Sequence, residues 1–308
     1  MTRRFVPMQL GSIEIFIKAA ETLSFVKTAV ALGLSAAAVS RSVARLEQRL
    51  GASLFTRSTR RMILTDDGLL YADHCRTAVR QIAEAEDMLS GRQNSPSGQL
   101  RISVPTTYAH YRLAPLLPDF MAKYPDIQIE LNISNRNIDF TEDGFDLAIR
   151  LGELTDSQLV SRKLEDAALG IFAAPAYLAS HPAPTAPEDL SLHSLIPFEV
   201  PSTGRPFAWL FCGTAGDFEI IPKSRIIISQ DFLGCVSHAV AGGGLVQAYD
   251  FIAARYVKSG DLVEVLKPYR GRTRRFSVIY PPNRQIAPRV RAFIDYLASA
   301  LGRIPPNQ

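Results

Sequence analysis

The chain has 308 residues, of which 47% are hydrophobic and 21% are charged. That length predicts two domains with sizeable cores, and the composition excludes a mainly disordered chain. No apolar run approaches the roughly 18 residues that a membrane helix needs, and no apolar stretch typical of a secretion signal precedes Pro7. Three widely spaced cysteines fit a reducing compartment, so we expect a cytoplasmic protein.

The positive charge is concentrated at the start of the chain. Residues 1–61 hold ten lysines and arginines against three acidic residues, an excess of seven. Residues 62–95 hold three basic and six acidic residues, and the remaining residues hold 21 of each. This asymmetry predicts an N-terminal domain that binds a polyanion, joined to a neutral body.

The apolar spacing of the N-terminal region predicts three short helices, over 8–22, from Ser24 to Leu32, and from Ser35 to about Leu50. Ser24 and Ser35 are expected to be N-caps, and glycines follow the second and third helices. One face of the third helix is expected to be buried through Val39, Val43, Leu46 and Leu50. Residues 53–65 read as a basic β-hairpin, so residues 1–65 are predicted to form a winged helix-turn-helix domain.

A fourth helix is predicted over residues 66–90, with apolar residues at alternating spacings of four and three. These residues, called the seam below, are Tyr71, Cys75, Ala78, Ile82, Ala85 and Leu89. The pattern is typical of a coiled coil and predicts dimerisation with a second copy of the chain. The alternative is a helix that packs against its own domain.

Residues 91–99 are rich in Gly, Ser, Pro and Asn and are predicted to be a hinge. Beyond it, apolar alternation predicts strands that alternate with helices, which indicates mostly parallel sheets in two lobes with a cleft between them. The strands are expected near 100–104, 127–133, 145–152, 159–164, 168–174, 195–199, 225–229, 244–248 and 275–280. The helices are expected near 112–123, 231–242, 250–258 and 287–301.

The N-terminal 66 residues resemble the DNA-binding domain of LysR-type transcriptional regulators. The resemblance rests on many positions at fixed offsets: Ser24, Phe25, Ala29, Leu32, Ser35, Ala38, Val39, Ser40, Arg41, Leu46, Glu47, Leu50, Gly51, Leu54, Phe55, Arg57, Arg60, Arg61, Leu64, Thr65 and Gly68. It continues to the C-terminus through LRISVP, LLPDFMAKYPDIQIEL, FDLAIRLGELTDSQLVSRKL and PPNRQIAPRVRAFIDYLA. The segments AIRLG and PAYLA look closest to the subgroup that includes the regulator CrgA.

The resemblance implies an α+β multidomain protein, with a C-terminal two-lobed α/β domain like that of periplasmic binding proteins. Residues 100–308 would form this effector-binding domain, with lobe I at 100–163 and 267–301 and lobe II at 164–266. The implied function is sequence-specific DNA binding that a small-molecule effector modulates. The implied partners are promoter DNA, the effector and further copies of the chain in a homodimer or dimer-of-dimers homotetramer, with RNA polymerase left open.

The third helix is expected to lie in the major groove of DNA, with Ala36, Ala37, Ser40, Arg41, Arg45 and Arg49 on its polar face. The family often has Gln-Pro where this chain has Ala36 and Ala37, so a polar base reader is missing here. Further contacts, mainly to phosphates, are expected from Ser24, Lys27, Ser35, Arg57, Thr59, Arg60 and Arg61. Each arginine taken alone is equally well explained as a solvated charge, and Glu47 is a candidate partner for Arg45 and Arg49.

Ligands of open α/β sheets bind beyond the carboxyl ends of strands. That rule selects nine effector-binding candidates: Thr106, Thr107, Ser134, Asn135, Phe198, Ser202, Gln230, Asp231 and Gln247. Their hydroxyl and amide groups suit a small organic acid or another metabolite, although Asp231 opposes an anion, and Gln247 would make a polar pocket floor. For each residue alone, a helix cap is the simpler explanation.

No nucleotide-binding, nucleophile-elbow or zinc motif occurs in the chain, so we expect neither an enzyme nor a metal or organic cofactor. The rivals to a regulator are a two-lobed solute-binding protein and an enzyme on the same scaffold. The basic run from Lys267 to Arg275 suggests either a second phosphate contact or a solvated loop.

Overall fold

The computed structural model of the protein describes residues 10–57, 62–89, 96–152, 159–282 and 286–302. The chain divides into two compact units, and the division along the sequence falls after residue 93. We call them the head unit and the C-terminal unit and describe each by itself. Within the described residues no single helix is long and apolar enough to span a membrane; α2 and α3 meet that test only as a pair, bent by 109°.

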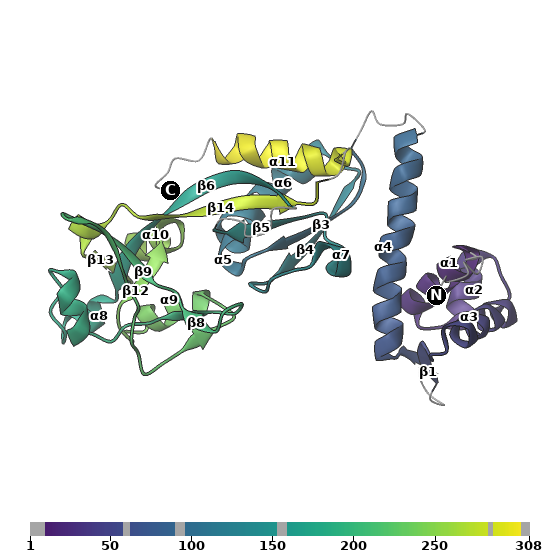
Figure 1. Cartoon of the computed structure of the whole chain (residues 1–308), viewed down its shortest axis with the longest axis horizontal. Coiled ribbons are helices and arrows are strands. Elements are labelled where there is room, and N and C mark those ends of the chain that lie inside the picture. Colours follow the sequence, from purple (N-terminus) through teal and green to yellow (C-terminus); the bar gives the residue numbers. More distant parts are fainter. Residues whose placement is uncertain (1–9, 58–61, 90–95, 153–158, 283–285, 303–308) are drawn as a thin grey trace, which may run out of the picture. The chain divides into compact units, whose positions relative to one another are not determined.

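The head unit contains four helices and a small hairpin (Figure 1). They are α1 (Leu10–Thr22), α2 (Phe25–Leu32), α3 (Ala36–Leu50), β1 (Phe55–Arg57), β2 (Met62–Leu64) and α4 (Asp66–Leu89). The Ser24 hydroxyl accepts a hydrogen bond from the backbone N–H of Lys27 at 3.3 Å, and that of Ser35 accepts from Ala38 at 3.2 Å. The two predicted N-caps are therefore confirmed, and β1 and β2 form the predicted antiparallel hairpin.

The core of the head unit lies between α1, α3 and the hairpin, around Phe16, Leu46 and Leu54. Val39, Val43 and Leu46 of α3 are buried as predicted, but Leu50 is 39% exposed. The prediction for Leu50 was wrong because this residue ends the helix, where Gly51 turns the chain with a φ of 70°.

The first half of α4 packs against its own head unit. A Cβ at Gly68 would lie 2.0 Å from the carbonyl oxygen of Leu54, so only glycine allows this close approach. The Tyr71 ring lies 5.4 Å from the ring of Phe16, and Cys75 is only 5% exposed. The prediction that the whole seam faces a second copy is therefore wrong for Tyr71 and Cys75, which the head unit itself covers.

The second half of the seam is different. Ala78 and Ile82 are exposed, with Ile82 at 40%, and the side chains of Ala85 and Leu89 lie outside the described part of the chain. The seam is thus buried against the rest of the head unit near the start of α4. At Ala78 and Ile82 no described residue of the chain covers it.

A seven-stranded sheet forms the centre of the C-terminal unit. Its strands are β3 (Gly98–Val104), β4 (Ile127–Ile133), β5 (Leu147–Leu151), β6 (Val160–Ala173), β12 (Val246–Tyr249), β13 (Val263–Val265) and β14 (Thr273–Tyr280). The order is β12-β6-β14-β5-β3-β4, and β13 also pairs with β6. Only the β3–β4 and β3–β5 pairs are parallel, so the expectation of mostly parallel pairing is wrong for this sheet. β3 also begins two residues early, which places Gly98 and Gln99 in the strand rather than in the hinge.

Two long strands, β6 and β14, run through both lobes of this unit (Figure 1). The first part of β6 pairs with β14, from Val160 opposite Tyr280, and its last part pairs with β12, at Phe172 opposite Val246. The two separate strands predicted near 159–164 and 168–174 are thus one strand. Between them, Glu165 and Asp166 pair with β14 in the sheet, and their side chains form ion pairs with Arg112 and Arg275.

Helices and smaller strands complete the two lobes. The helices are α5 (Thr106–Tyr108), a π-helical turn (Ala109–Leu113), α6 (Leu117–Lys123), α7 (Phe140–Asp143), α8 (Pro175–Leu178), α9 (Leu233–Val240), α10 (Asp250–Ser259) and α11 (Pro288–Leu301). Short strands are β7 (Phe198–Val200), β8 (Arg205–Pro206), β9 (Trp209–Gly213), β10 (Gly216–Ile220) and β11 (Ile228–Ser229). The antiparallel β9–β10 hairpin was missed by the sequence reading, although a Gly-flanked two-residue turn between apolar runs signals it.

Candidate functional site

The polar face of α3 is open to solvent. Arg41 and Arg45 are exposed, Ser40 is half-buried, and the opposite face is buried in the core of the head unit. Among the described residues, neither Arg41 nor Arg45 has a carboxylate partner. Ala37 is exposed and Ala36 half-buried at the start of the same helix. The helix therefore presents cationic and small side chains in the arrangement that groove recognition uses.

Glu47 does not pair with the arginines of α3. Its Oε1 accepts hydrogen bonds from the backbone N–H groups of Leu54 and Phe55, at 2.8 and 3.1 Å. The carboxylate thus fixes the start of the hairpin relative to α3. Arg49 lies beside Tyr71 of α4 rather than on the polar face of α3, and burial raises the pKa of the Tyr71 hydroxyl despite this cation.

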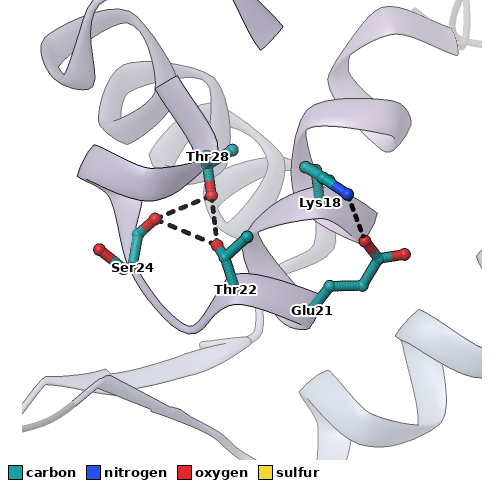
Figure 2. A network of polar contacts seen from close by, with 5 residues as sticks. All are labelled: Lys18, Glu21, Thr22, Ser24 and Thr28. Carbon is teal, nitrogen blue, oxygen red and sulfur yellow. Dashed lines mark hydrogen bonds and ion pairs between the residues drawn. The ribbon is translucent and has the colours of Figure 1, made fainter. Parts of the chain in front are cut away.

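A small polar network holds the turn between α1 and α2 (Figure 2). The hydroxyls of Thr22 and Thr28 lie 2.7 Å apart, and their oxygens lie 3.1 and 2.9 Å from the carbonyl oxygen of Ser24. Thr28 is fully buried, so these bonds satisfy its hydroxyl inside the head unit. The network positions Ser24 and the exposed Lys27 at the start of α2.

The other predicted DNA contacts are partly described. Ser35 is exposed at the start of α3. Arg57 is the last residue of β1, and its side chain lies outside the described part of the chain. Thr59, Arg60 and Arg61 lie wholly outside it.

The C-terminal unit contains a cavity of about 160 Å³ between its lobes. Four of the nine predicted residues line it together: Thr107, Asn135, Phe198 and Ser202. The remaining lining residues are Pro105, Asn137, Arg150, Leu151, Val200, Pro201, Phe207, Phe232, Tyr249 and Phe276. The rule that ligands bind beyond the carboxyl ends of strands therefore located the cavity, although it did not find most of its lining.

Three predicted residues lie outside the cavity lining, and two of them hold a residue that lines it. The Asn135 amide accepts from the backbone N–H of Thr106 at 3.3 Å and donates to the carbonyl oxygen of Gln230 at 2.6 Å. Thr106 and Gln230 thus hold a lining residue without lining the cavity. Ser134 uses its hydroxyl locally, accepting from the backbone N–H of Arg136 at 3.2 Å.

Two predictions are corrected outright. Gln247 is not a pocket floor, because its buried amide bonds both the N–H and the carbonyl oxygen of Leu210, at 3.0 and 2.9 Å. Asp231 does not face the cavity as an opposing charge; its carboxylate accepts from the backbone N–H of Leu233 at 3.0 Å at the start of α9.

Arg150 is the charged residue that the sequence reading missed. It lies in β5, and its guanidinium donates to the hydroxyl of Ser103 and the carbonyl oxygen of Ile149, both at 2.7 Å, and to that of Arg136 at 3.1 Å. An arginine inside the apolar strand FDLAIRLG was the available signal, since such residues are rarely buried without a task.

Two largely buried residues with hydroxyl groups also line the cavity. Thr107 is 5% exposed and Tyr249 is 6% exposed, and neither hydroxyl has a hydrogen-bond partner among the described residues. Burial raises the pKa of Tyr249 to about 12, so this group stays a neutral donor. Hydroxyls that line a cavity without a protein partner can donate to the acceptor atoms of a ligand.

The basic run from Lys267 to Arg275 is neither a phosphate site nor a solvated loop. Arg270 pairs with Asp250 and Glu264, and Arg272 lies 3.4 Å from Asp217. Arg274 donates to the carbonyl oxygen of Ala208 at 2.6 Å and lies 4.1 Å from the Phe207 ring centroid. These arginines are used to hold the C-terminal unit together.

Comparisons with known proteins agree with this arrangement. The family description "LysR substrate binding domain" matches residues 93–302, and "Bacterial regulatory helix-turn-helix protein, lysR family" matches residues 10–69. A transcriptional regulator of Xanthomonas campestris pv. campestris is 35% identical over 294 residues, which are 95% of this chain and 85% of that protein. A transcriptional repressor of Pseudomonas aeruginosa is 35% identical over 97% of this chain and 94% of its own length.

The solved structure of CrgA from Neisseria meningitidis, a LysR-type regulator, matches 96% of this chain and 100% of that chain, with a TM-score of 0.61 and 29% identity. Full-length AphB from Vibrio cholerae matches 95% of this chain and 99% of its own, with a TM-score of 0.60 and 27% identity. The named relatives are transcriptional regulators and not enzymes, which confirms that expectation. The chain belongs to the LysR family of transcriptional regulators.

Proposed function

We propose that this regulator reads promoter DNA with paired α3 helices and that a small molecule in the cavity of the C-terminal unit modulates this binding. The observation that carries the DNA half is the solvent-exposed polar face of α3, where Arg41 and Arg45 have no carboxylate partner among the described residues. Such arginines read guanine edges. Lys27, Ser24, Ser35 and the hairpin arginines then add phosphate contacts, which raise affinity without selecting a sequence.

One head unit covers a few base pairs, so pairing is needed for useful affinity. We assign the pairing to the exposed part of the seam, at Ala78 and Ile82, and extend it to Ala85 and Leu89. A dimer of such dimers is the assembly we expect, in the cytoplasm where promoter DNA is found. RNA polymerase is the further partner that a bound regulator would meet.

The effector half rests on the cavity. Its lining joins residues after β3 and β4 to residues of β7 and β12, so a bound ligand would touch both lobes. A ligand that binds one arrangement of the lobes more tightly shifts the population toward it. The change would reach the paired head units through residues 90–97 and alter the bend or spacing of the DNA.

The test compares two variants of the full chain on DNA. After an operator has been selected from genomic fragments, we expect Arg41→Ala to lower the operator-to-competitor affinity ratio by about 5–150-fold, the equivalent of 1–3 kcal/mol per base-reading contact. Lys27→Ala should weaken both affinities alike and reduce the salt slope by about one. An unchanged ratio in Arg41→Ala would refute the role of α3.

A further inference from the structure

The cavity has two chemically different sides. Lobe I contributes the polar side, with Thr107, Asn135, Asn137 and the Arg150 guanidinium. The other side carries five aromatic rings, those of Phe198, Phe207, Phe232, Tyr249 and Phe276. No aspartate or glutamate is among the described lining residues.

The rings form a connected group. The centroids of Phe198 and Phe232 lie 5.5 Å apart in an edge-on arrangement, those of Phe232 and Tyr249 lie 6.0 Å apart, and those of Tyr249 and Phe276 lie 5.4 Å apart. Rings in such contact accept a further aromatic ring by stacking or edge contact, which is worth about 0.5–1.5 kcal/mol beyond the buried area.

The size of the cavity limits the ligand. An apolar protein cavity of about 150 Å³ holds one benzene molecule. The accessible space of about 160 Å³ therefore matches one six-membered ring with a small substituent better than a bicyclic ring system. The polar side selects the substituent, because the Arg150 guanidinium and the hydroxyls of Thr107 and Tyr249 line a cavity whose described lining has no carboxylate, which suits an anionic oxygen.

We propose that the effector of this regulator is a single-ring aromatic carboxylate, whose carboxylate binds the Arg150 and Thr107 side and whose ring lies among the five aromatic residues. The proposal rests on the proposed function insofar as it places the effector in this cavity. Because the Arg150 and Thr107 side belongs to lobe I and four of the five rings (Phe198, Phe207, Phe232 and Tyr249) belong to lobe II, such a ligand joins the lobes, whereas a small inorganic anion or an alkane would engage one side only.

The test is calorimetric titration of the full chain with benzoate and the three monohydroxybenzoates. Three matched probes each change one property: benzamide lacks the charge, cyclohexanecarboxylate lacks the aromatic ring, and 2-naphthoate adds a second ring. We expect at least one benzoate to bind tenfold or more tightly than all three probes. If none of the four benzoates binds more tightly than cyclohexanecarboxylate, the assignment is wrong.

A variant pair locates the binding. Thr107→Val removes one hydroxyl and keeps the side-chain shape, and we expect it to weaken benzoate binding about fivefold or more. Thr273→Val makes the same change at an exposed position outside the cavity lining and should leave the affinity unchanged. Equal affinities in the two variants would place the ligand elsewhere and overturn the proposal.

DNA binding separates this proposal from the function on which it rests. If no benzoate binds while Arg41→Ala still lowers operator selectivity, the assigned ligand class is wrong and the DNA-binding role is unaffected. If a benzoate binds as expected and the operator affinity and footprint stay unchanged, the ligand class stands and the regulatory role of the cavity falls.

Discussion

At the scale of single residues, the head unit depends on polar side chains that bind backbone groups. Ser24 and Ser35 were predictable because a cap is a local property of a few residues. Glu47 was not, because its partners Leu54 and Phe55 lie seven and eight residues further along and meet it only after α3 and the hairpin have packed. The prediction for Gln247 was wrong for a similar reason, because the Leu210 backbone that its amide binds is 37 residues away in sequence.

Replacing Glu47 with Ala should loosen the hairpin. The variant leaves the N–H groups of Leu54 and Phe55 without their acceptor, at a cost of about 1–3 kcal/mol. Amide hydrogen exchange at these two residues should become about 5–150-fold faster. Glu47→Gln keeps one acceptor oxygen, so its exchange rates should lie between those of Glu47→Ala and the wild type. Exchange rates equal to the wild type in both variants would contradict the role assigned to Glu47.

The three cysteines should differ in reactivity. Burial raises the pKa of the Cys235 thiol to about 12, and that of Cys75, which the head unit covers, is also raised by burial. Burial and Asp217 also raise the pKa of the Cys212 thiol, so exposure rather than acidity sets the order, and iodoacetamide should modify the half-exposed Cys212 first. Peptide mass spectrometry reads the order, and unfolding in guanidinium should make the three rates similar. If Cys235 is modified as fast as Cys212 in the folded protein, the burial of Cys235 described here is wrong.

At the scale of elements, periodicity identified helices well but not what each face contacts. The seam of α4 was found from its spacing, yet only the packed structure shows that Tyr71 and Cys75 are covered by the head unit. Likewise two strands were expected near 159–164 and 168–174, whereas β6 continues through Glu165 and Asp166, which pair with the distant Arg112 and Arg275. In both cases the deciding partner comes from another element.

The two halves of the seam should therefore respond differently to substitution. Ile82→Glu places a charge on the exposed half and should weaken self-association at least tenfold while the head unit stays folded. Tyr71→Ala removes a ring packed on Phe16 and should destabilise the head unit by about 1–3 kcal/mol. Sedimentation and thermal unfolding distinguish the two; an Ile82→Glu protein that associates like the wild type would refute the interface.

A histidine cluster in lobe II predicts a pH effect. Tyr177 stacks on His181 at 4.3 Å and bonds His193 Nδ1 at 3.2 Å, with Asp189 nearby. Burial, and then the neighbouring His181, lower the pKa of His193 below its usual 6.5. The folded state then binds this proton more weakly than the unfolded chain, so the stabilisation is complete above pH 6.5 and is lost as the pH falls below it.

We therefore expect the melting temperature of the C-terminal unit to fall by a few degrees between pH 7.5 and 5.5. His193→Gln should reduce this dependence, whereas His110→Gln, at an exposed position, should not. Scanning calorimetry at several pH values checks both, and the same slope in His193→Gln as in the wild type would exclude His193 as its source.

At the scale of the whole molecule, the chain joins a helix-turn-helix unit to a two-lobed α/β unit. The charge excess of residues 1–61 and the strand and helix alternation after residue 98 predicted a polyanion-binding unit followed by an α/β unit, and the resemblance to LysR-type regulators implied the roles of the two. The contents of the cavity were not predicted, because Arg150, Phe207, Tyr249 and Phe276 come from strands and loops that are far apart in sequence.

The most direct test of paired DNA reading is a nuclease footprint of the full chain on its selected operator. The wild type and Arg41→Ala are compared at protein concentrations that give the same occupancy of nonspecific DNA. We predict two protected half-sites separated by whole turns of the DNA helix in the wild type, and their joint loss in the variant. A single protected site, or a paired footprint that Arg41→Ala leaves intact, would contradict DNA reading by paired α3 helices.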